Sequence, residues 1–124
     1  MRLIIAGGRH HRLSPENIIQ LNQLGQVSTV ISGGASGIDS DGEQWAHSRD
    51  IPIKIYLADW SAHGKMAGPL RNRTMAENAD ALAIFPGGKG TESMYKEANK
   101  LKLKIFDFRA NAQLHLNFDK ENKA

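Results

Sequence analysis

The chain has 124 residues, a formal net charge of +3 and no cysteine. This length suits one domain with its own core, and the lack of cysteine excludes a disulfide scaffold, a thiolate metal site and a cysteine nucleophile. Its apolar runs are far shorter than the roughly 20 residues that a membrane-spanning helix needs, and the apolar start is too short for a secretory signal. We therefore expect a globular, cytoplasmic protein, in which a mild basic excess permits an anionic partner without demanding one.

Short apolar runs alternate with helix-length segments along the chain, a pattern typical of repeated βαβ units and a parallel sheet. The pattern predicts five strands, at residues 3–6, 27–31, 53–57, 81–85 and 104–108. It predicts four helices between them, at residues 15–24, 38–49, 69–78 and 92–101. Pro15 and Pro69 stand in or just before predicted first turns, where proline is tolerated.

The character of each strand indicates its place in the sheet. The first and fourth are continuously apolar, as strands covered on both faces are. The third and fifth alternate with lysine, and Pro52 precedes the third, which is typical of edge strands. We therefore predict a Rossmann-like, doubly wound α/β fold, with helices on both faces of a five-stranded, mostly parallel sheet in the order 3-2-1-4-5.

The predicted domain spans residues 1–108, and residues 109–124 form a polar C-terminal tail. In this tail Leu114, Leu116 and Phe118 alternate with polar residues. The alternation leaves an added strand, docking on a neighbour and fraying open as alternatives.

Glycines cluster directly after the first, second and fourth predicted strands. The three turns are Gly7-Gly8-Arg9, Gly33-Gly34-Ala35-Ser36-Gly37 and Pro86-Gly87-Gly88-Lys89-Gly90-Thr91. In a parallel sheet they emerge at one edge, beside the reversal of strand order where open α/β sheets bind ligands. We expect each turn to open a helix whose free amides point into this crevice, which is a ready anion site.

Charged residues of both signs collect at the same edge. They are Arg9, His10, His11, Arg12, Lys65, Arg71, Arg73, Lys89, Asp39, Asp41, Asp59 and Glu92. Basic groups suit a phosphate and carboxylates suit hydroxyls, so the set fits a nucleotide or sugar phosphate. For Arg12 and Arg73 a solvated loop charge is the better interpretation. The chain lacks both a P-loop and a Gly-x-Gly-x-x-Gly after the first strand, so neither an NTPase nor a standard NAD enzyme is well supported.

Several motifs, taken together and in order, resemble a known family. They are Gly-Gly-Arg at 7–9, Gly-Gly-Ala-Ser-Gly-Ile-Asp at 33–39, Ala-Asp-Trp at 58–60, Gly-Lys-x-Ala-Gly-Pro-x-Arg-Asn at 64–72, Met75, and Phe-Pro-Gly-Gly-x-Gly-Thr at 85–91. The chain is similar in these motifs to the YspA/cpYpsA-related branch of the SLOG superfamily, whose relatives include the Lonely-guy phosphoribohydrolases and DprA. The resemblance implies a Rossmann-like fold that binds a nucleotide or nucleotide-derived ligand. It also implies a homo-oligomer, because relatives often pair through helices.

The resemblance is incomplete where the Lonely-guy enzymes carry out catalysis. In those enzymes an arginine four residues before a methionine, and the glutamate of Pro-Gly-Gly-x-Gly-Thr-x-x-Glu, act in cleaving the N-glycosidic bond of a nucleoside monophosphate. Arg71, four residues before Met75, matches the arginine, but Met94 occupies the glutamate position. A thioether does no acid–base work. Asp39 is the most plausible replacement carboxylate, and His10 stands where many members of this branch have aspartate.

We expect the amides of residues 87–91 to hold a phosphate, with the Thr91 hydroxyl capping the helix or touching the same oxygens. Arg71 would pair with a phosphate through its planar fork, and Asn72 would orient Arg71 or the ligand. Asp39 would accept from ribose hydroxyls or cap a helix, and Trp60 would stack on a base or pack in the core. The whole predicted ligand-binding set is Gly7, Gly8, Arg9, Gly33, Gly34, Gly37, Asp39, Trp60, Arg71, Asn72, Pro86, Gly87, Gly88, Gly90 and Thr91.

Two functions follow from this set. One is a binding or sensing module for a nucleotide, and the alternative is a nucleotide-processing hydrolase of a glycosidic or phosphoester bond, with Arg71 and Asp39 as catalytic residues. Met94 favours binding. DNA binding, as in DprA, has little support, because the basic excess is small and no aromatic series accompanies it. The histidines lack metal-ligand spacing, so we assign no metal and no cofactor beyond the nucleotide itself. His10 and His63 remain candidate acid–base groups.

Overall fold

A computed structural model describes residues 1–110 of the chain. Five strands form one sheet, and every neighbouring pair is parallel. The strands are β1 (Arg2–Ala6), β2 (Thr29–Ser32), β3 (Ile53–Ile55), β4 (Ala81–Ile84) and β5 (Lys104–Asp107), in the order β3-β2-β1-β4-β5. The predicted Rossmann-like fold and strand order are confirmed.

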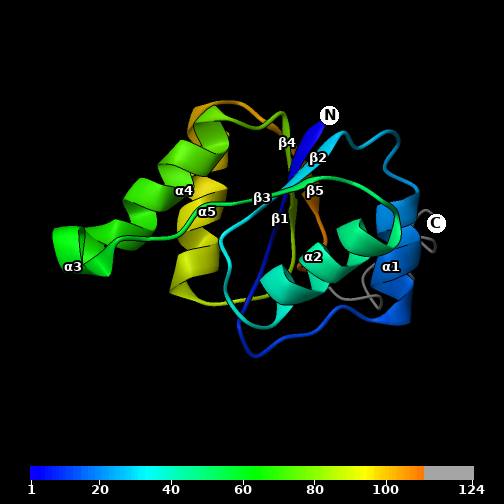
Figure 1. The fold of residues 1–124 in the computed structure, drawn as a ribbon, viewed down its shortest axis with the longest axis horizontal. Helices are drawn as coiled ribbons and strands as arrows, with labels where there is room; N and C mark the ends of the chain where they lie inside the picture. Colours follow the sequence, from blue (N-terminus) through cyan, green and yellow to red (C-terminus); the bar gives the residue numbers. More distant parts are fainter. Residues whose placement is uncertain (111–124) are drawn as a thin grey trace.

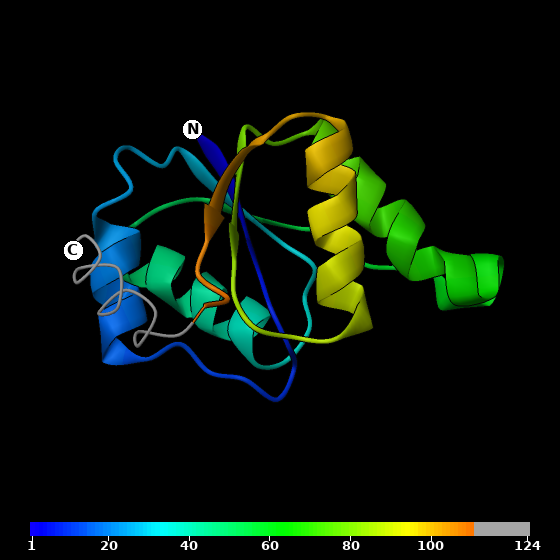
Figure 2. The same ribbon diagram turned by 180° about the vertical axis from the view of Figure 1, so that it is seen from behind.

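The helices form a layer on each face of this sheet (Figure 1). Helices α1 (Pro15–Asn22) and α2 (Ile38–Ser48) cover one face, and α4 (Ala67–Glu77) and α5 (Lys89–Lys100) cover the other. Seen from behind, α4 and α5 lie side by side (Figure 2). The short helix α3 (Trp60–His63) and the 3-10 turn η1 (Gly64–Met66) precede α4.

The side chains of the central strand β1 alternate between two apolar clusters. Leu3 and Ile5 pack with α1 and α2, whereas Ile4 and Ala6 pack with α4 and α5. Because both faces are covered, a central strand has no polar side, which explains the continuous apolar run. The edge strands β3 and β5 contain no fully buried residue, as their alternation with lysine predicts.

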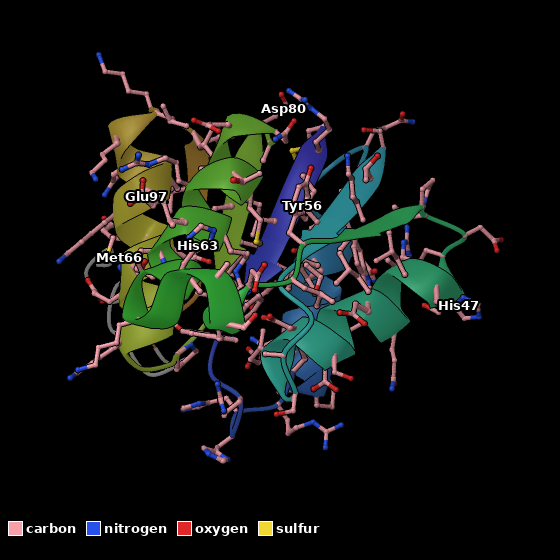
Figure 3. The ribbon with its side chains drawn as sticks, turned by 60° about the vertical axis from the view of Figure 1, so that its left-hand side comes forward. His47, Tyr56, His63, Met66, Asp80 and Glu97 are labelled. Atoms are coloured by element: carbon pink, nitrogen blue, oxygen red, sulfur yellow. The ribbon has the colours of Figure 1, made fainter. Side chains whose placement is uncertain are left out.

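Helix α3 and η1 were not predicted from the sequence. Asp59 is the N-cap of α3, and its carboxylate accepts hydrogen bonds from the amide of Ala62 at 3.1 Å and the hydroxyl of Ser61 at 2.9 Å. A helix of four residues is too short to show a 3.6-residue period, so only the cap marks it. The two elements form an arm that projects beyond the sheet (Figure 1), and His63 and Met66 lie on it (Figure 3).

The last described residues pack back onto the domain. Phe108 stacks on Phe85 with ring centroids 5.2 Å apart. Arg109 bonds Asp107 at 2.8 Å and lies over the Tyr95 ring, 4.2 Å from its centroid. The alternation at Leu114, Leu116 and Phe118 falls outside the described residues. No helix within residues 1–110 combines the length and the apolar character needed to cross a membrane.

Gly42 of α2 faces the central strand at close range, and this contact is testable. A Cβ on Gly42 would lie 2.8 Å from Ile5 Cγ2. Alanine favours a helix over glycine by about 1 kcal/mol, but overpacking a rigid core costs more. We expect Gly42→Ala to lower the free energy of unfolding by about 1–3 kcal/mol in urea titrations. In an Ile5→Ala background, which removes the obstructing Cγ2, the same change should become neutral or stabilising. An equal cost in both backgrounds would contradict this account.

Candidate ligand-binding site

The three glycine turns meet at the carboxyl edge of the sheet through backbone hydrogen bonds. The amide of Gly8 donates to the carbonyl of Pro86 at 2.8 Å, and the carbonyl of Gly8 accepts from the amide of Ile38 at 3.2 Å. The turn after β1 is therefore held between the turn that follows β2 and the turn that follows β4. Their convergence creates a cavity with backbone in its walls.

This cavity has a volume of about 410 Å³. Ten of the fifteen predicted ligand-binding residues line it: Gly7, Gly8, Arg9, Gly33, Asp39, Arg71, Asn72, Gly88, Gly90 and Thr91. It is also lined by Ala6, His10, His11, Ala35, Met75, Lys89 and Met94. Such a volume lies within the roughly 300–1,000 Å³ typical of small-molecule sites.

Four predicted glycine and proline residues support the cavity without lining it. Gly37 has φ +76°, and a Cβ there would overlap the carbonyl oxygen of Gly8. Pro86 and Gly87 press against Gly8, since a Cβ on Gly87 would lie 2.7 Å from the Gly8 nitrogen. Gly34, with φ +77°, packs beside the side chains of β3 and the segment after it. These positions shape the turns that a ligand would meet.

Trp60 is a predicted site residue that lies outside the cavity. It begins α3, is 58% exposed and places its ring edge against Gly68. It therefore neither lines the cavity nor packs in the core, the two roles expected from the sequence. The intervening chain explains this, because the extended segment after β3 carries Trp60 onto the projecting arm (Figure 1).

The turn between β4 and α5 presents a row of free backbone donors. Within residues 1–110, no atom accepts a hydrogen bond from the amides of residues 87–91, and the first helical bond runs from the amide of Glu92 to the carbonyl of Gly88. Gly88 is the N-cap and supplies no side chain to them. Thr91 is only 7% exposed and lines the cavity, yet its hydroxyl has no partner among the described residues. Residues 87–90 are exposed, so water can reach their amides, whereas Thr91 is buried. Buried donors are normally satisfied, so the Thr91 amide and hydroxyl are the two donors of this run whose lack of a partner in the described chain is unusual.

Arg71 lines the cavity, but two of the three nitrogens of its guanidinium already donate hydrogen bonds within the chain. Its Nε donates to Asn72 Oδ1 at 2.9 Å, and its Nη1 donates to the carbonyls of Gly33 at 2.7 Å and Tyr56 at 3.1 Å. Only Nη2 has no partner within the described chain. The chain's own carbonyls occupy Nη1, so Nη2 is the nitrogen of the planar fork through which the predicted pairing with a phosphate would run. Burial lowers the pKa of Arg71 and Asp39 opposes that change, but a guanidinium stays charged in proteins.

Asp39 is a buried carboxylate in the cavity wall, with 7% of its surface exposed. Its Oδ2 accepts from the amide of Ala35 at 3.2 Å. Burial raises the pKa of Asp39 to about 6, with a small contribution from Glu43, while the Ala35 and Gly7 amides and the charge of Arg71 hold it lower. Asp39 thus bonds to the turn before its helix, and it places a negative group where the start of α2 was expected to attract an anion.

The start of α1 also differs from expectation. Its first turn is capped by Ser14, whose hydroxyl accepts from the Asn17 amide at 3.0 Å while Asn17 bonds back. These two residues form a capping box, which satisfies donors at the helix end. The glycine turn after β1 therefore does not open a helix at the cavity, because the chain runs on from Arg9 to Ser14 first. In the turn before α5, all five amides of residues 87–91 lack an acceptor within residues 1–110, whereas Gly8, Gly34 and Ala35 in the other two turns donate within the chain.

Two of the basic residues at this edge are bound to carboxylates elsewhere. Arg12 forms a two-nitrogen contact with Asp41, at 2.9 Å for each bond. Arg73 lies 3.6 Å from Glu97. The basic groups left at the cavity are Arg71 with Arg9, Lys89, His10 and His11. Within the described residues no three acidic or histidine side chains gather closely enough to hold a metal ion.

Met75 and Met94 form part of an apolar surface in the cavity. Each is 2% exposed, and each belongs to the cluster under α4 and α5. Met94 therefore lies at both the core and the cavity. The position that would carry a glutamate in the Lonely-guy motif does face the cavity, and here it offers a thioether.

The buried state of Asp39 predicts how stability changes with pH. The folded protein holds this proton more tightly than the unfolded chain does, so the Asp39 contribution to stability is present at acidic pH and is lost as pH rises from about 4 to about 6. A change from 3.8 to about 6 corresponds to roughly 3 kcal/mol at most. We expect Asp39→Asn to raise the free energy of unfolding at pH 7 by about 1–3 kcal/mol and to remove this slope.

Asp41→Asn is the matched control on the same helix. The Arg12 side chain lowers the pKa of Asp41, so its stabilising contribution is present at neutral pH and is lost on acidification. Its replacement should therefore destabilise the protein at pH 7. Urea titrations across pH 4–8 measure both effects, and two variants that changed stability in the same direction would contradict the assignment.

No family model matches the chain. The chain is 36% identical over 87 residues to the Gene 61 protein of Mycobacterium phage D29, and the match covers 64% of this chain and 70% of that protein. Identity and coverage at this level show common descent of most of the domain described above. The chain therefore belongs to the same family as the Gene 61 protein of Mycobacterium phage D29.

Proposed function

We propose that the cavity binds a nucleotide or a nucleotide-derived phosphate ligand, and that the protein is a binding or sensing module of the SLOG superfamily. The observation that carries this proposal is the run of free amides at residues 87–91. Consecutive amides at a helix start gather partial positive charge and point toward one place, which is how backbone binds phosphate.

Side-chain donors lie around the same run of amides. The hydroxyl of Thr91 and the Nη2 of Arg71 both lack partners in the described chain, and Lys89 and Arg9 lie at the cavity. A phosphate has enough oxygen lone pairs for several of these donors at once. Charge-assisted bonds of this kind contribute about 1.5–3 kcal/mol each, so a few of them suffice for specific binding.

The rest of the cavity suits the sugar and base of such a ligand. Asp39 offers carboxylate oxygens to hydroxyl groups, and the largely buried Met75 and Met94 make part of the cavity wall apolar. Donors thus lie at the α5 side and acceptors at the α2 side. This polarity favours a ligand with an anionic end and a hydroxyl-bearing end over a simple inorganic ion.

A nucleotide hydrolase is the second candidate, and the environment of Asp39 favours it. Burial raises the pKa of Asp39 to about 6, which suits a group that exchanges protons near neutral pH. Met94 counts against the Lonely-guy reaction, because a thioether stands at the position of the catalytic carboxylate. Turnover would then depend on Asp39 with Arg71.

A comparison of two arginines on α4 tests the proposed function. Arg71 lies in the cavity, whereas Arg73 is largely exposed and pairs with Glu97. A panel of nucleoside monophosphates, nicotinamide nucleotides and ADP-ribose should contain a ligand that binds. Arg71→Ala should weaken its binding by about tenfold or more, as expected for a lost charge-assisted bond, and Arg73→Ala should leave it unchanged.

Calorimetry and chromatography of the mixtures measure binding and turnover together. Binding without release of base or phosphate supports the module, and release that Asp39→Asn abolishes supports the hydrolase. Equal affinity of wild type and Arg71→Ala for every ligand that binds would overturn the placement of the ligand in this cavity.

A further inference from the structure

Asn72 joins the two sides of the proposed anion site. It is 5% exposed, and its Oδ1 accepts from Arg71 Nε at 2.9 Å. Its Nδ2 donates to the carbonyl of Gly90 at 3.3 Å and to the Ser93 hydroxyl at 3.1 Å. The amide orientation is fixed by chemistry, because Arg71 Nε is a donor and needs the oxygen opposite it. Both hydrogens of Nδ2 are used within the chain, so Asn72 has no donor left for a ligand.

The first of these hydrogen bonds, from Arg71 Nε to Asn72 Oδ1, fixes the direction of the guanidinium. Arg71 Nη1 is bound by two carbonyls, those of Gly33 and Tyr56. The added bond from Nε holds the plane of the group from its other edge. A planar group held at Nε and Nη1 leaves Nη2 as its free corner, in a fixed position. The freedom that a long side chain usually loses on binding is thereby lost in advance.

The hydrogen bond from Asn72 Nδ2 to the Gly90 carbonyl acts on the peptide group that joins Gly90 to Thr91. The carbonyl of Gly90 and the amide of Thr91 belong to the same planar unit, and no peptide bond in the described chain is cis. In a trans peptide the C=O and N–H point in opposite directions. Holding the Gly90 oxygen therefore fixes where the Thr91 N–H points, and accepting a hydrogen bond at that oxygen polarises the N–H further.

We propose that Asn72 is a positioning residue, which sets Arg71 Nη2 and the Thr91 amide for the same anion without contacting it. This inference rests on the proposed phosphate site. An amide suits the role better than a carboxylate. Aspartate at 72 would accept from Arg71 but could not donate to Gly90, and its charge would offset the guanidinium that the anion needs.

The test uses inorganic phosphate as the probe and the backbone amide signals of residues 87–91 as the readout in NMR titrations. Arg71→Ala should weaken phosphate binding by about tenfold, and Asn72→Ala should weaken it by about five- to tenfold. In the Arg71→Ala background, the cost of Asn72→Ala should fall to about twofold, because one of the two groups that it positions has gone and only its effect on the Thr91 amide remains. A purely structural role would give equal factors in both backgrounds.

Two further variants complete the design. Asn78→Ala is the control, since Asn78 caps the same helix and its Nδ2 bonds only the Thr74 carbonyl; phosphate affinity should not change. Asn72→Asp keeps the shape and the Arg71 contact, so it tests the role even if Asn72→Ala does not fold, and it should bind phosphate at least about fivefold more weakly.

The outcomes separate the two proposals. Wild-type affinity in Asn72→Asp, or independent effects of Asn72→Ala and Arg71→Ala, would overturn the positioning role and leave the phosphate site intact. A wild-type protein whose amides at 87–91 do not respond to phosphate, with no effect of Arg71→Ala, would overturn the site and the positioning role together.

Discussion

The close approach of three backbone turns is the constraint on which this pocket depends. Gly8 is bonded on one side to Pro86 and on the other to Ile38, and Cβ atoms at Gly37 and Gly87 would collide with it. At this spacing no side chain fits between the turns, so the wall that they form consists of peptide groups. The positions of those groups are set by the parallel sheet beneath them, which is buried and rigid. A ligand would therefore meet donors whose geometry the fold fixes in advance.

The two helices that begin at the cavity differ in their electrostatics. The turn before α2 bonds the carboxylate of Asp39, which uses part of its positive potential within the chain. The first turn of α5 contains Glu92, but this side chain pairs with Arg109 at 3.4 Å, and the amides of residues 87–91 stay free. An anion is thus favoured at α5 and disfavoured at α2. Under the proposed function, this difference orients the ligand with its phosphate toward α5.

Much of the fold was predictable because its signals are local. Residues 3–6 and 81–84 of the inner strands are apolar without a break, edge strands carry lysine, and glycine turns mark the ends of strands. The order of the sheet therefore followed from short local segments. The site was harder, because it depends on long-range partners. Nothing near Arg71 in sequence indicates that the carbonyls of Gly33 and Tyr56 occupy its Nη1. The capping box at the start of α1 has Asn17 where the usual pattern has glutamate or glutamine. Helix α3 was missed because four residues show no period.

Under the proposed function, whether the protein only binds its ligand or also hydrolyses it depends on how far Asp39 lies from the reacting atoms, rather than on the charge of the cavity. Met75 and Met94 make part of the cavity wall apolar, and a hydrogen bond in low-dielectric surroundings is stronger than one in water. The same burial raises the pKa of Asp39 to about 6, so this carboxyl can hold or release a proton near neutral pH. Such a group serves recognition when it faces a hydroxyl, and it serves hydrolysis only when it reaches the leaving atom or the attacking water. Its bond to Ala35 holds it at the α2 side, away from the phosphate expected at α5, which favours contact with the sugar.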